Sequence, residues 1–391
     1  MSMSNQLPDP DLPATEHSAR LVALIQQEIA AAGGWLSFSE YMRLALYAPG
    51  LGYYQAGAAK FGEQGDFVTA PEISALFSAC LAGQVAEVLV KTGCRTVLEL
   101  GAGSGLMAAD MLLELQRLQE LPQRYLILEP SPDLRERQQH LLQQRVPDLL
   151  DRVVWLDSLP EQGFSGVVVA NEVLDALPVS RFEFGSSGAL ELGVSQEGAG
   201  LSVASRPVKG ALKDFTGRLA SMVDLPAGYR SEVCFAASGL IHSLGGLLDK
   251  GAVFLIDYGL SQAEFYSAER SDGTMRCHYR HHVHNDPLLY PGIQDITAWV
   301  DFTRVGEAAL QAGLNVAAYT TQAHFLLHSG ITAQLELRQT DSAVSNAQMS
   351  AQVQKLTLPG EMGEVFKVML LTTDDVLPST GFQGRDLRVK L

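Results

Sequence analysis

The sequence predicts an α/β fold built on a doubly wound, mainly parallel sheet. Short apolar runs alternate with helical stretches from residue 95 onward, and a glycine-rich turn follows the first run. Continuous apolar runs are typical of strands buried on both faces, and the helices between them provide right-handed crossovers. The five predicted strands are TVLEL (96–100), YLILE (125–129), VVWLD (153–157), GVVVANEV (166–173) and AVFLIDYG (252–259).

The region before the sheet is predicted to be helical. Apolar residues recur at helical spacing over 18–32, and Gly33 and Gly34 end that helix. A second helix is expected over 39–47, with Ser37 or Ser39 as its capping residue. We therefore expect an N-terminal region at 1–94 and a core at 95–391.

A β-rich insertion is predicted between the fourth and fifth core strands, at about 178–250, because a single crossover helix needs far fewer residues. Its FEFG, LELGVS and LSVASR pieces predict short antiparallel strands, and 231–248 predicts the returning helix. A second insertion is expected at about 259–296, followed by a helix over 303–312. The pieces LNVAAYTTQ and VFKVMLLTT are expected to add an antiparallel edge to the sheet.

Composition excludes several classes of partner. The net charge of −16, from 28 Lys and Arg against 44 Asp and Glu, disfavours binding to nucleic acid. The four cysteines show no C-x-x-C spacing, which favours reduced thiols over zinc or disulfides. The N-terminus lacks a signal or transit pattern, and no apolar run reaches the ~18 residues of a membrane span. We expect a cytoplasmic protein without membrane insertion.

The glycine turn Gly101-Ala102-Gly103-Ser104-Gly105 is a candidate ligand site. It follows the first strand directly, where glycine permits a tight turn and close approach of the backbone to a ligand. Leu106 stands where a dinucleotide fingerprint needs its third glycine, which argues against NAD. Glu99 ends the strand, and a carboxylate there suits a cationic sulfonium and ammonium better than a pyrophosphate. S-adenosyl-L-methionine is therefore the expected cofactor, and a purely structural turn is the alternative.

Polar residues end the next strands as well. Glu129 follows the second strand, where an acid can accept both ribose hydroxyls of a nucleoside, although a solvated charge is common at such a position. Asp157 ends the third strand, and Asn171 and Glu172 follow the fourth. Ligands of open α/β sheets bind along the carboxyl edge, so we expect these side chains at one site.

Long blocks of this chain are similar to the MidA-like methyltransferases, a family that includes the mitochondrial complex I assembly factor acting as a protein arginine methyltransferase. The blocks are SFSEYMRLALYAPGLGYY, FGEQGDFVTAPEISALF, LELGAGSG, LEPS, ANEVLDALPVSRFE, DYG and GTMRCHYRHHVHNDPLLYPGIQDITAWVDF. The resemblance implies a Rossmann-like, seven-strand methyltransferase core that uses S-adenosyl-L-methionine.

The resemblance also implies roles for individual residues. Gly65 and Asp66 would belong to an N-terminal lid near the cofactor, supported by Thr69, Pro71 and Glu72; the alternative is a loop that caps a helix at Pro71. Asp157 would lie near the adenine amino group, and helix capping is its alternative.

The implied reaction is methylation of an arginine on a protein client, with a respiratory complex subunit as one candidate. Carboxylates can orient a cationic guanidinium and stabilise its charge, and Glu172 and Asp175 are the predicted catalytic residues. Their alternative role is as first-turn acids of a helix, and Arg181 is explained equally well by a surface salt bridge.

Two other functions stay open: a noncatalytic assembly factor that binds a client through this fold, and a small-molecule methyltransferase. The histidines at 278, 281, 282 and 284 match no closed zinc pattern, so no metal site is predicted and a substrate-facing or structural loop is preferred.

Overall fold

A computed structural model describes residues 7–56, 68–373, 376 and 378–391. These residues divide into two compact units, each assembled from separate stretches of chain. We call the first the sheet unit, which comprises residues 68–174, 237–261 and 302–391. The second, the accessory unit, comprises residues up to 67 together with 175–236 and 262–301.

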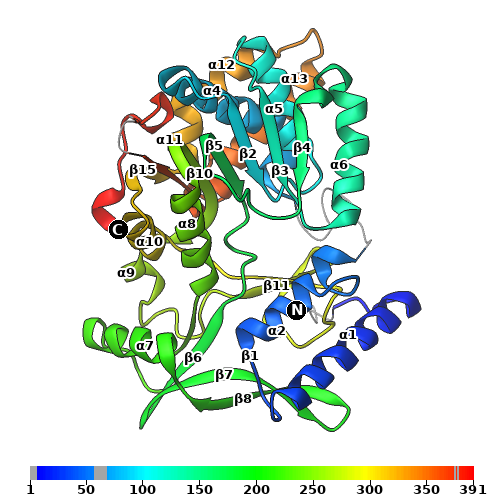
Figure 1. The fold of residues 1–391 in the computed structure, drawn as a ribbon, viewed down its shortest axis with the longest axis vertical. Helices are drawn as coiled ribbons and strands as arrows, with labels where there is room; N and C mark the ends of the chain where they lie inside the picture. Colours follow the sequence, from blue (N-terminus) through cyan, green and yellow to red (C-terminus); the bar gives the residue numbers. More distant parts are fainter. Residues whose placement is uncertain (1–6, 57–67, 374–375, 377) are drawn as a thin grey trace. The chain divides into compact units, whose positions relative to one another are not determined.

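The sheet unit contains the five predicted parallel strands (Figure 1). They are β2 (Thr96–Leu100), β3 (Arg124–Leu128), β4 (Val153–Leu156), β5 (Phe164–Asn171) and β10 (Leu248–Leu260). The strand order is β15-β16-β10-β5-β2-β3-β4, which places β2 in the middle of the parallel strands. Strands β4 and β5 are joined by a short connection without a helix.

The two predicted C-terminal strands extend this sheet beyond β10. They are β15 (Asn315–Thr321) and β16 (Phe366–Thr372). As predicted, β16 is antiparallel to β10. The edge strand β15 is antiparallel to β16 and therefore runs parallel to the core strands, a direction that the sequence did not indicate.

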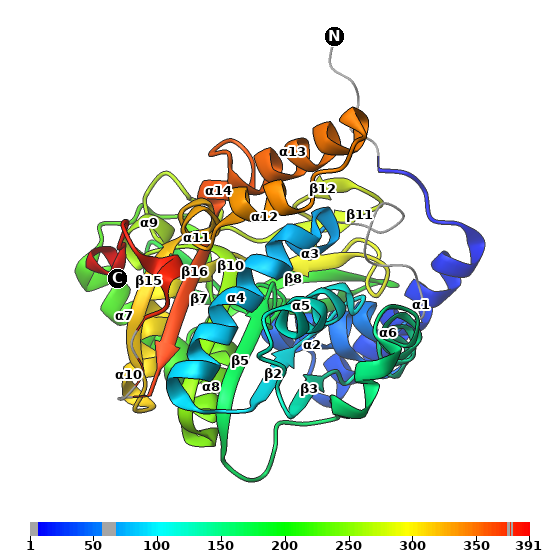
Figure 2. The ribbon, with the colours of Figure 1, turned by 90° about the horizontal axis from the view of Figure 1, so that it is seen from above.

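Several helices share one core with the sheet and cover one of its faces. Helices α4 (Ala75–Thr92) and α5 (Leu106–Arg117) pack side by side, and α4 also contacts β5 and β10 (Figure 2). By length and composition α4 could cross a membrane, with a mean hydropathy of 1.3, but 67% of it is buried. Its apolar residues Leu81 and Val85 share one core with Val97 of β2 and Val167 of β5, so α4 is a core helix.

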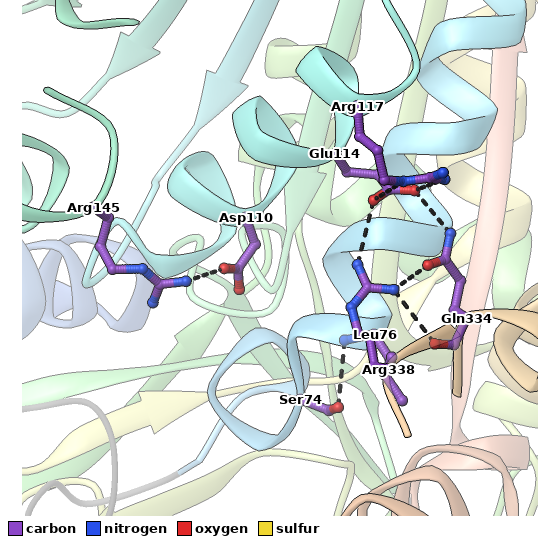
Figure 3. A network of polar contacts seen from close by, with 8 residues as sticks. All are labelled: Ser74, Leu76, Asp110, Glu114, Arg117, Arg145, Gln334 and Arg338. Carbon is purple, nitrogen blue, oxygen red and sulfur yellow. Dashed lines mark hydrogen bonds and ion pairs between the residues drawn. The ribbon is translucent and has the colours of Figure 1, made fainter. Parts of the chain in front are cut away.

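Helix α5 starts at the glycine turn and is tied to its neighbours by charges (Figure 3). Asp110 pairs with Arg145 of α6 (Pro132–Arg145) at 2.6 Å. Buried Glu114 accepts hydrogen bonds from Arg117 at 2.6 Å and from Gln334 of α12 (Ile331–Leu337) at 2.8 Å. These contacts fix the helix whose N-terminus carries the candidate site.

The other helices of the sheet unit are α3 (Ala70–Ile73), α8 (Phe235–Leu247), α10 (Phe302–Gln311), α11 (Gln322–His328), α13 (Ala343–Thr357) and α14 (Met362–Val365). The first two residues of α8 fall in the accessory unit.

The accessory unit contains the predicted β-rich insertion. The strands β6 (Ser180–Gly185), β7 (Gly188–Glu197) and β8 (Gly200–Pro207) form an antiparallel meander, as FEFG, LELGVS and LSVASR predict. Strand β9 (Arg230–Val233), which was not predicted, pairs with β6, and β1 (Leu36–Ser37) pairs with β7. A smaller sheet has the order β12-β11-β13, formed by His282–His284, Arg276–Tyr279 and Asp295–Thr297.

All three stretches of the accessory unit contribute helices. They are α1 (Leu12–Ala31), α2 (Phe38–Tyr47), α7 (Gly210–Met222) and the short α9 (Gln262–Phe265). Helix α1 begins earlier than the predicted residue 18, because the Asp11 carboxylate caps it by accepting the Ala14 N–H. Ser37 caps α2 by accepting the Glu40 N–H. The unit boundaries differ from the expected division at residue 94, because α3 and α4 pack in the sheet unit.

Candidate cofactor site

The glycine turn has a backbone that requires glycine. Gly101, Gly103 and Gly105 have φ angles of 63°, 55° and 88°, which side chains rarely adopt. Space is limited too, since a Cβ on Gly105 would lie 3.3 Å from Gln138 and a Cβ on Gly101 would lie 3.3 Å from Val173. The predicted strand–turn–helix is therefore present, with Gly105 immediately before α5.

The short helix α3 contacts this turn. Glu72, on α3, accepts a short hydrogen bond from the Ser104 hydroxyl. Burial raises the pKa of Glu72, and the Ser104 hydrogen bond partly offsets that effect. The FGEQGDFVTAPE block thus contributes at least one side chain to the turn. Gly65 and Asp66 lie outside the described residues.

Glu99 is fully buried on the face of β2 that packs against α5. Its Oε2 accepts a hydrogen bond from the Tyr125 hydroxyl at 2.6 Å, whereas Oε1 has no hydrogen-bond partner within the described part of the chain. Burial raises the pKa of Glu99 to about 7; the Tyr125 hydrogen bond lowers it and neighbouring Glu129 raises it. A buried carboxylate oxygen without a donor is expected where a ligand supplies one.

Glu129 lies just beyond β3 and is buried. Its Oε1 accepts the Ser131 N–H at 2.9 Å, and its Oε2 accepts a hydrogen bond from the Gln138 amide at 3.0 Å. Ser131 is also the N-cap of α6. The carboxylate is therefore held by the start of α6, and Gln138 links it to the Gly103 carbonyl of the glycine turn.

Asp157 has a different environment from Glu129. Its side chain is 86% exposed and pairs with Arg135 at 2.6 Å. Arg135 also donates to the carbonyl oxygens of Glu129, at 2.8 Å, and Leu156. No helix follows Asp157, so the alternative role of helix cap is wrong. Asp157 instead holds an arginine that braces the ends of β3 and β4.

Asn171 and Glu172 lie at the end of β5. Asn171 is buried and donates to Glu172 Oε1 at 3.2 Å, and Glu172 Oε1 also accepts the Ala70 N–H of α3 at 3.4 Å. Glu172 has a φ of 53°, unusual for a residue other than glycine. Such backbone strain is often found at functional sites and is stabilised by the surrounding structure. Here the Glu172 N–H donates to the Ile256 carbonyl at 2.9 Å.

Asp257 is a buried acid beside the turn after β5, and it was not predicted from the sequence. It is 1% exposed in β10, where Oδ2 accepts the Leu174 N–H at 3.0 Å and Oδ1 accepts the Tyr258 N–H at 2.9 Å. It thereby supports the turn after β5. The sequence signal was present, because Asp257 ends an apolar run as Glu99 does.

Asp175 falls in the accessory unit, where it is buried and its carbonyl accepts the Ala298 N–H at 3.0 Å. No helix follows β5, so the interpretation of Glu172 and Asp175 as first-turn helix acids is wrong. The left-handed backbone at Glu172 does not start an α-helix, and the chain continues into β6. Arg181 is not on the surface either; it is 8% exposed, 5.2 Å from the Phe38 ring.

The histidine-rich segment forms the hairpin of β11 and β12. Arg280 and His281 make its turn with positive φ angles, and the His282 ring donates to the Arg280 carbonyl at 2.8 Å. Burial lowers the pKa of His284. Across the described ranges, no three His, Cys, Asp or Glu side chains gather in a way that could hold a metal ion.

The polar side chains at the carboxyl edge of β2, β3 and β5 fit a ligand that carries both a cation and a nucleoside. Buried carboxylates lie beside a backbone turn that only glycine can make, and Glu99 Oε1 and Asn171 Oδ1 are buried without partners in the described residues. Carboxylates repel a pyrophosphate but attract a sulfonium and an ammonium. Fold and site together define a Rossmann-like protein that binds a cationic nucleoside.

Comparison with known proteins identifies the family. Residues 80–320 match the model of a family described as "Putative S-adenosyl-L-methionine-dependent methyltransferase", and the chain belongs to this family. The protein is an S-adenosylmethionine-dependent methyltransferase, and its cofactor and its Rossmann-like α/β fold are confirmed.

Solved structures and curated relatives agree with this family. A Burkholderia thailandensis protein bound to S-adenosyl-homocysteine is 43% identical, with a TM-score of 0.95 over 99% of this chain and 100% of that chain. "Protein arginine methyltransferase NDUFAF7, mitochondrial" from Xenopus laevis is 30% identical over 89% of this chain and 83% of its own length. The protein of that name from Danio rerio is 29% identical over 86% of this chain and 83% of its own length.

These relatives correct one expectation. The prediction of a cytoplasmic protein is wrong by this comparison, because the curated relatives are named as mitochondrial proteins. The prediction rested on the N-terminal residues, in which no signal or transit pattern was recognised, and on the lack of a membrane-length apolar run.

Proposed function

We propose that this methyltransferase methylates an arginine side chain of a protein client. The observation that carries the proposal is the similarity to relatives named as protein arginine methyltransferases, which extends over more than four fifths of both chains. The bound cofactor supplies an activated methyl group on a sulfonium. The protein therefore has to align the acceptor nitrogen and stabilise the charge of the guanidinium.

We assign the cofactor to the carboxyl edge of the sheet. Glu99 would accept a hydrogen bond from the ammonium of the cofactor, and Glu129 would accept hydrogen bonds from the ribose hydroxyls. The turn at Gly101, Gly103 and Gly105, with Ala102, would pass along the ligand. Asn171 would contribute its amide, and Asp157 would act at the adenine side. Gly65 and Asp66 are proposed as lid residues.

Glu172 and Asp175 are proposed as the carboxylates that orient the guanidinium. A planar cation that stays protonated near neutral pH is best held by carboxylates at fixed positions. Glu172 meets this need, because Asn171 and the start of α3 donate to its Oε1 and fix the side chain.

Isotope-labelled S-adenosylmethionine incubated with the protein and a cell lysate tests the proposal. Tandem mass spectrometry should find labelled methyl groups on arginine in a client protein. Glu172→Gln should lower the rate by at least roughly 100-fold and leave S-adenosyl-homocysteine affinity nearly unchanged. Glu136→Gln, at an exposed position on α6, is the matched control. Label on lysine or on a small molecule, or full activity of Glu172→Gln, would contradict the proposal.

A further inference from the structure

Gln138 is a buried amide between the glycine turn and Glu129. It lies on α6 and is 0% exposed. Its Nε2 lies 3.0 Å from the Gly103 carbonyl oxygen and 3.0 Å from Glu129 Oε2. Its Oε1 accepts the indole N–H of Trp155 at 3.0 Å. One side chain on α6 thus joins the glycine turn, the residue after β3 and strand β4.

The three partners determine which way round the amide lies. The Trp155 indole is a donor only, so it must face the amide oxygen. The Gly103 carbonyl and the Glu129 carboxylate are acceptors only, so both must face the NH₂ group, whose two N–H donors they use. The opposite orientation would place Oε1 against two acceptors. The amide is therefore fixed without any contact to a ligand.

The packing around Gln138 is equally restricted. A Cβ on Gly105 would lie 3.3 Å from both Cα and Cγ of Gln138. Helix α6 can approach the turn this closely because residue 105 is glycine. The glycine turn and the buried amide are thus two parts of one arrangement.

We propose that Gln138 is a positioning residue that fixes the Glu129 carboxylate for recognition of the cofactor ribose. The Ser131 N–H holds one carboxylate oxygen and Gln138 holds the other, so the carboxylate has a single orientation. The same amide ties that orientation to Gly103. Gln138 therefore sets the ribose acid at a constant position relative to the turn. This inference rests on the proposed assignment of Glu129 to the ribose.

Calorimetry with two ligands tests the inference. The probes are S-adenosyl-homocysteine and its analogue without the ribose 2′-hydroxyl, each titrated into the whole protein. Gln138→Met keeps the length of the side chain and removes both donors. We expect a roughly 10- to 100-fold loss of affinity for S-adenosyl-homocysteine, the range typical of a lost hydrogen bond to a charged group. The loss of affinity for the analogue should be several-fold smaller. The ratio of the two dissociation constants, which measures discrimination between the ligands, should therefore move toward one.

Control variants separate this role from a general structural effect. Gln139→Met changes the neighbouring, exposed residue of α6 and should leave both affinities unchanged. Gln138→Leu also removes both donors at a similar side-chain volume. It serves as the second test variant if Gln138→Met does not fold, and it should reduce the preference for S-adenosyl-homocysteine over its analogue in the same way. Equal losses for both ligands, or no loss, would overturn the inference.

Glu129→Gln in the same titrations distinguishes the two assignments. If Glu129→Gln leaves discrimination between the ligands unchanged, the ribose assignment fails, and the inference about Gln138 fails with it. If Glu129→Gln abolishes discrimination but Gln138→Met preserves it, only the inference about Gln138 is overturned.

Discussion

A carboxyl group in the middle of a sheet, such as that of Glu99, is charged only at a cost in free energy. The side chain is fully buried, and its pKa is raised to about 7. Near neutral pH the protein without cofactor therefore exists partly with Glu99 protonated. An arriving ammonium favours the ionised form, so we expect Glu99 to couple cofactor binding to pH.

Binding of S-adenosyl-homocysteine should release a proton from Glu99 and should strengthen as pH rises toward 7. Below its raised pKa, Glu99 is mostly protonated and must lose that proton before it can form an ion pair with the ligand ammonium. Calorimetry in two buffers of different ionisation enthalpy measures the released proton. Glu99→Gln should bind more weakly and with a flatter pH dependence. Equal proton release by this variant and the unmodified protein would contradict the prediction.

The same pKa predicts how stability varies with pH. The folded-state pKa of about 7 exceeds the ordinary 4.5, so the folded protein keeps a proton that the unfolded chain releases between these values. Glu99 thus contributes most to the free energy of unfolding below pH 4.5. This contribution, at most ~3 kcal/mol, is lost as the pH rises to 7. In urea unfolding, Glu99→Gln should lose less stability than the unmodified protein between pH 5 and 7. Parallel stability curves would refute this account.

Among single elements, helix α5 is held in place by the buried carboxylate of Glu114 and its partners. Burial raises the pKa of Glu114, but hydrogen bonds from Arg117 and Gln334 outweigh that effect, and the pKa is lowered. Arg338 also lies 3.3 Å from this carboxylate (Figure 3). The partners of Glu114 therefore offset the cost of burying its charge. Removal of the carboxylate leaves Arg338 without this ion pair.

Glu114→Ala should destabilise the protein by about 2–4 kcal/mol, because it removes the buried partner of a charge network. Glu120→Ala, which removes an exposed pair with Arg95, should change stability by less than about 1 kcal/mol. Urea unfolding measures both free energies. Similar losses for the two variants would show that the network does not stabilise α5.

The strands and their polar ends could be predicted because they follow local rules. Apolar runs identified β2, β3, β4, β5 and β10, and charges at strand ends identified Glu99 and Glu129. Gln138 was missed because α6 is polar overall. A signal did exist, since Gln138 lies four residues from both Leu134 and Leu142, and these three are the buried residues of the helix. A polar residue within an apolar stripe of a helix therefore indicates a buried polar group, as a charge within a strand does.

Other parts of the site depend on tertiary contacts that no local pattern contains. The hydrogen bond from Ser104 to Glu72 joins residues 32 positions apart, and Asp257 reaches Leu174 across 83 positions. The alternative interpretation of Glu172 and Asp175 as acids of a helix after β5 was wrong for the same reason. The backbone at Glu172 is stabilised by a bond to Ile256, on a strand far along the chain.

At the scale of the whole molecule, the accessory unit gathers three stretches of chain that the sequence could not bring together. Buried Glu232 of β9 accepts hydrogen bonds from the N–H and the hydroxyl of Thr274, both at 2.6 Å. This contact links residues 175–236 with residues 262–301 inside the unit. Individual strands were predictable, but this pairing of separate stretches arises only in the folded chain.

Thr274→Val should destabilise the protein by about 1–3 kcal/mol, because it removes a donor from a buried acid. Thermal unfolding followed by circular dichroism measures the change. Thr332→Val, at an exposed position on α12, is the control and should stay within about 0.5 kcal/mol. An unchanged melting temperature for Thr274→Val would show that Glu232 does not depend on this donor.

Hydrogen–deuterium exchange of the whole protein, with and without S-adenosyl-homocysteine, tests the central claim that the cofactor binds at the carboxyl edge of β2, β3 and β5. We expect ligand-dependent protection in peptides that cover 101–106, 129–131 and 171–174. Protection of other segments alone, with these peptides unchanged at saturating ligand, would contradict the account.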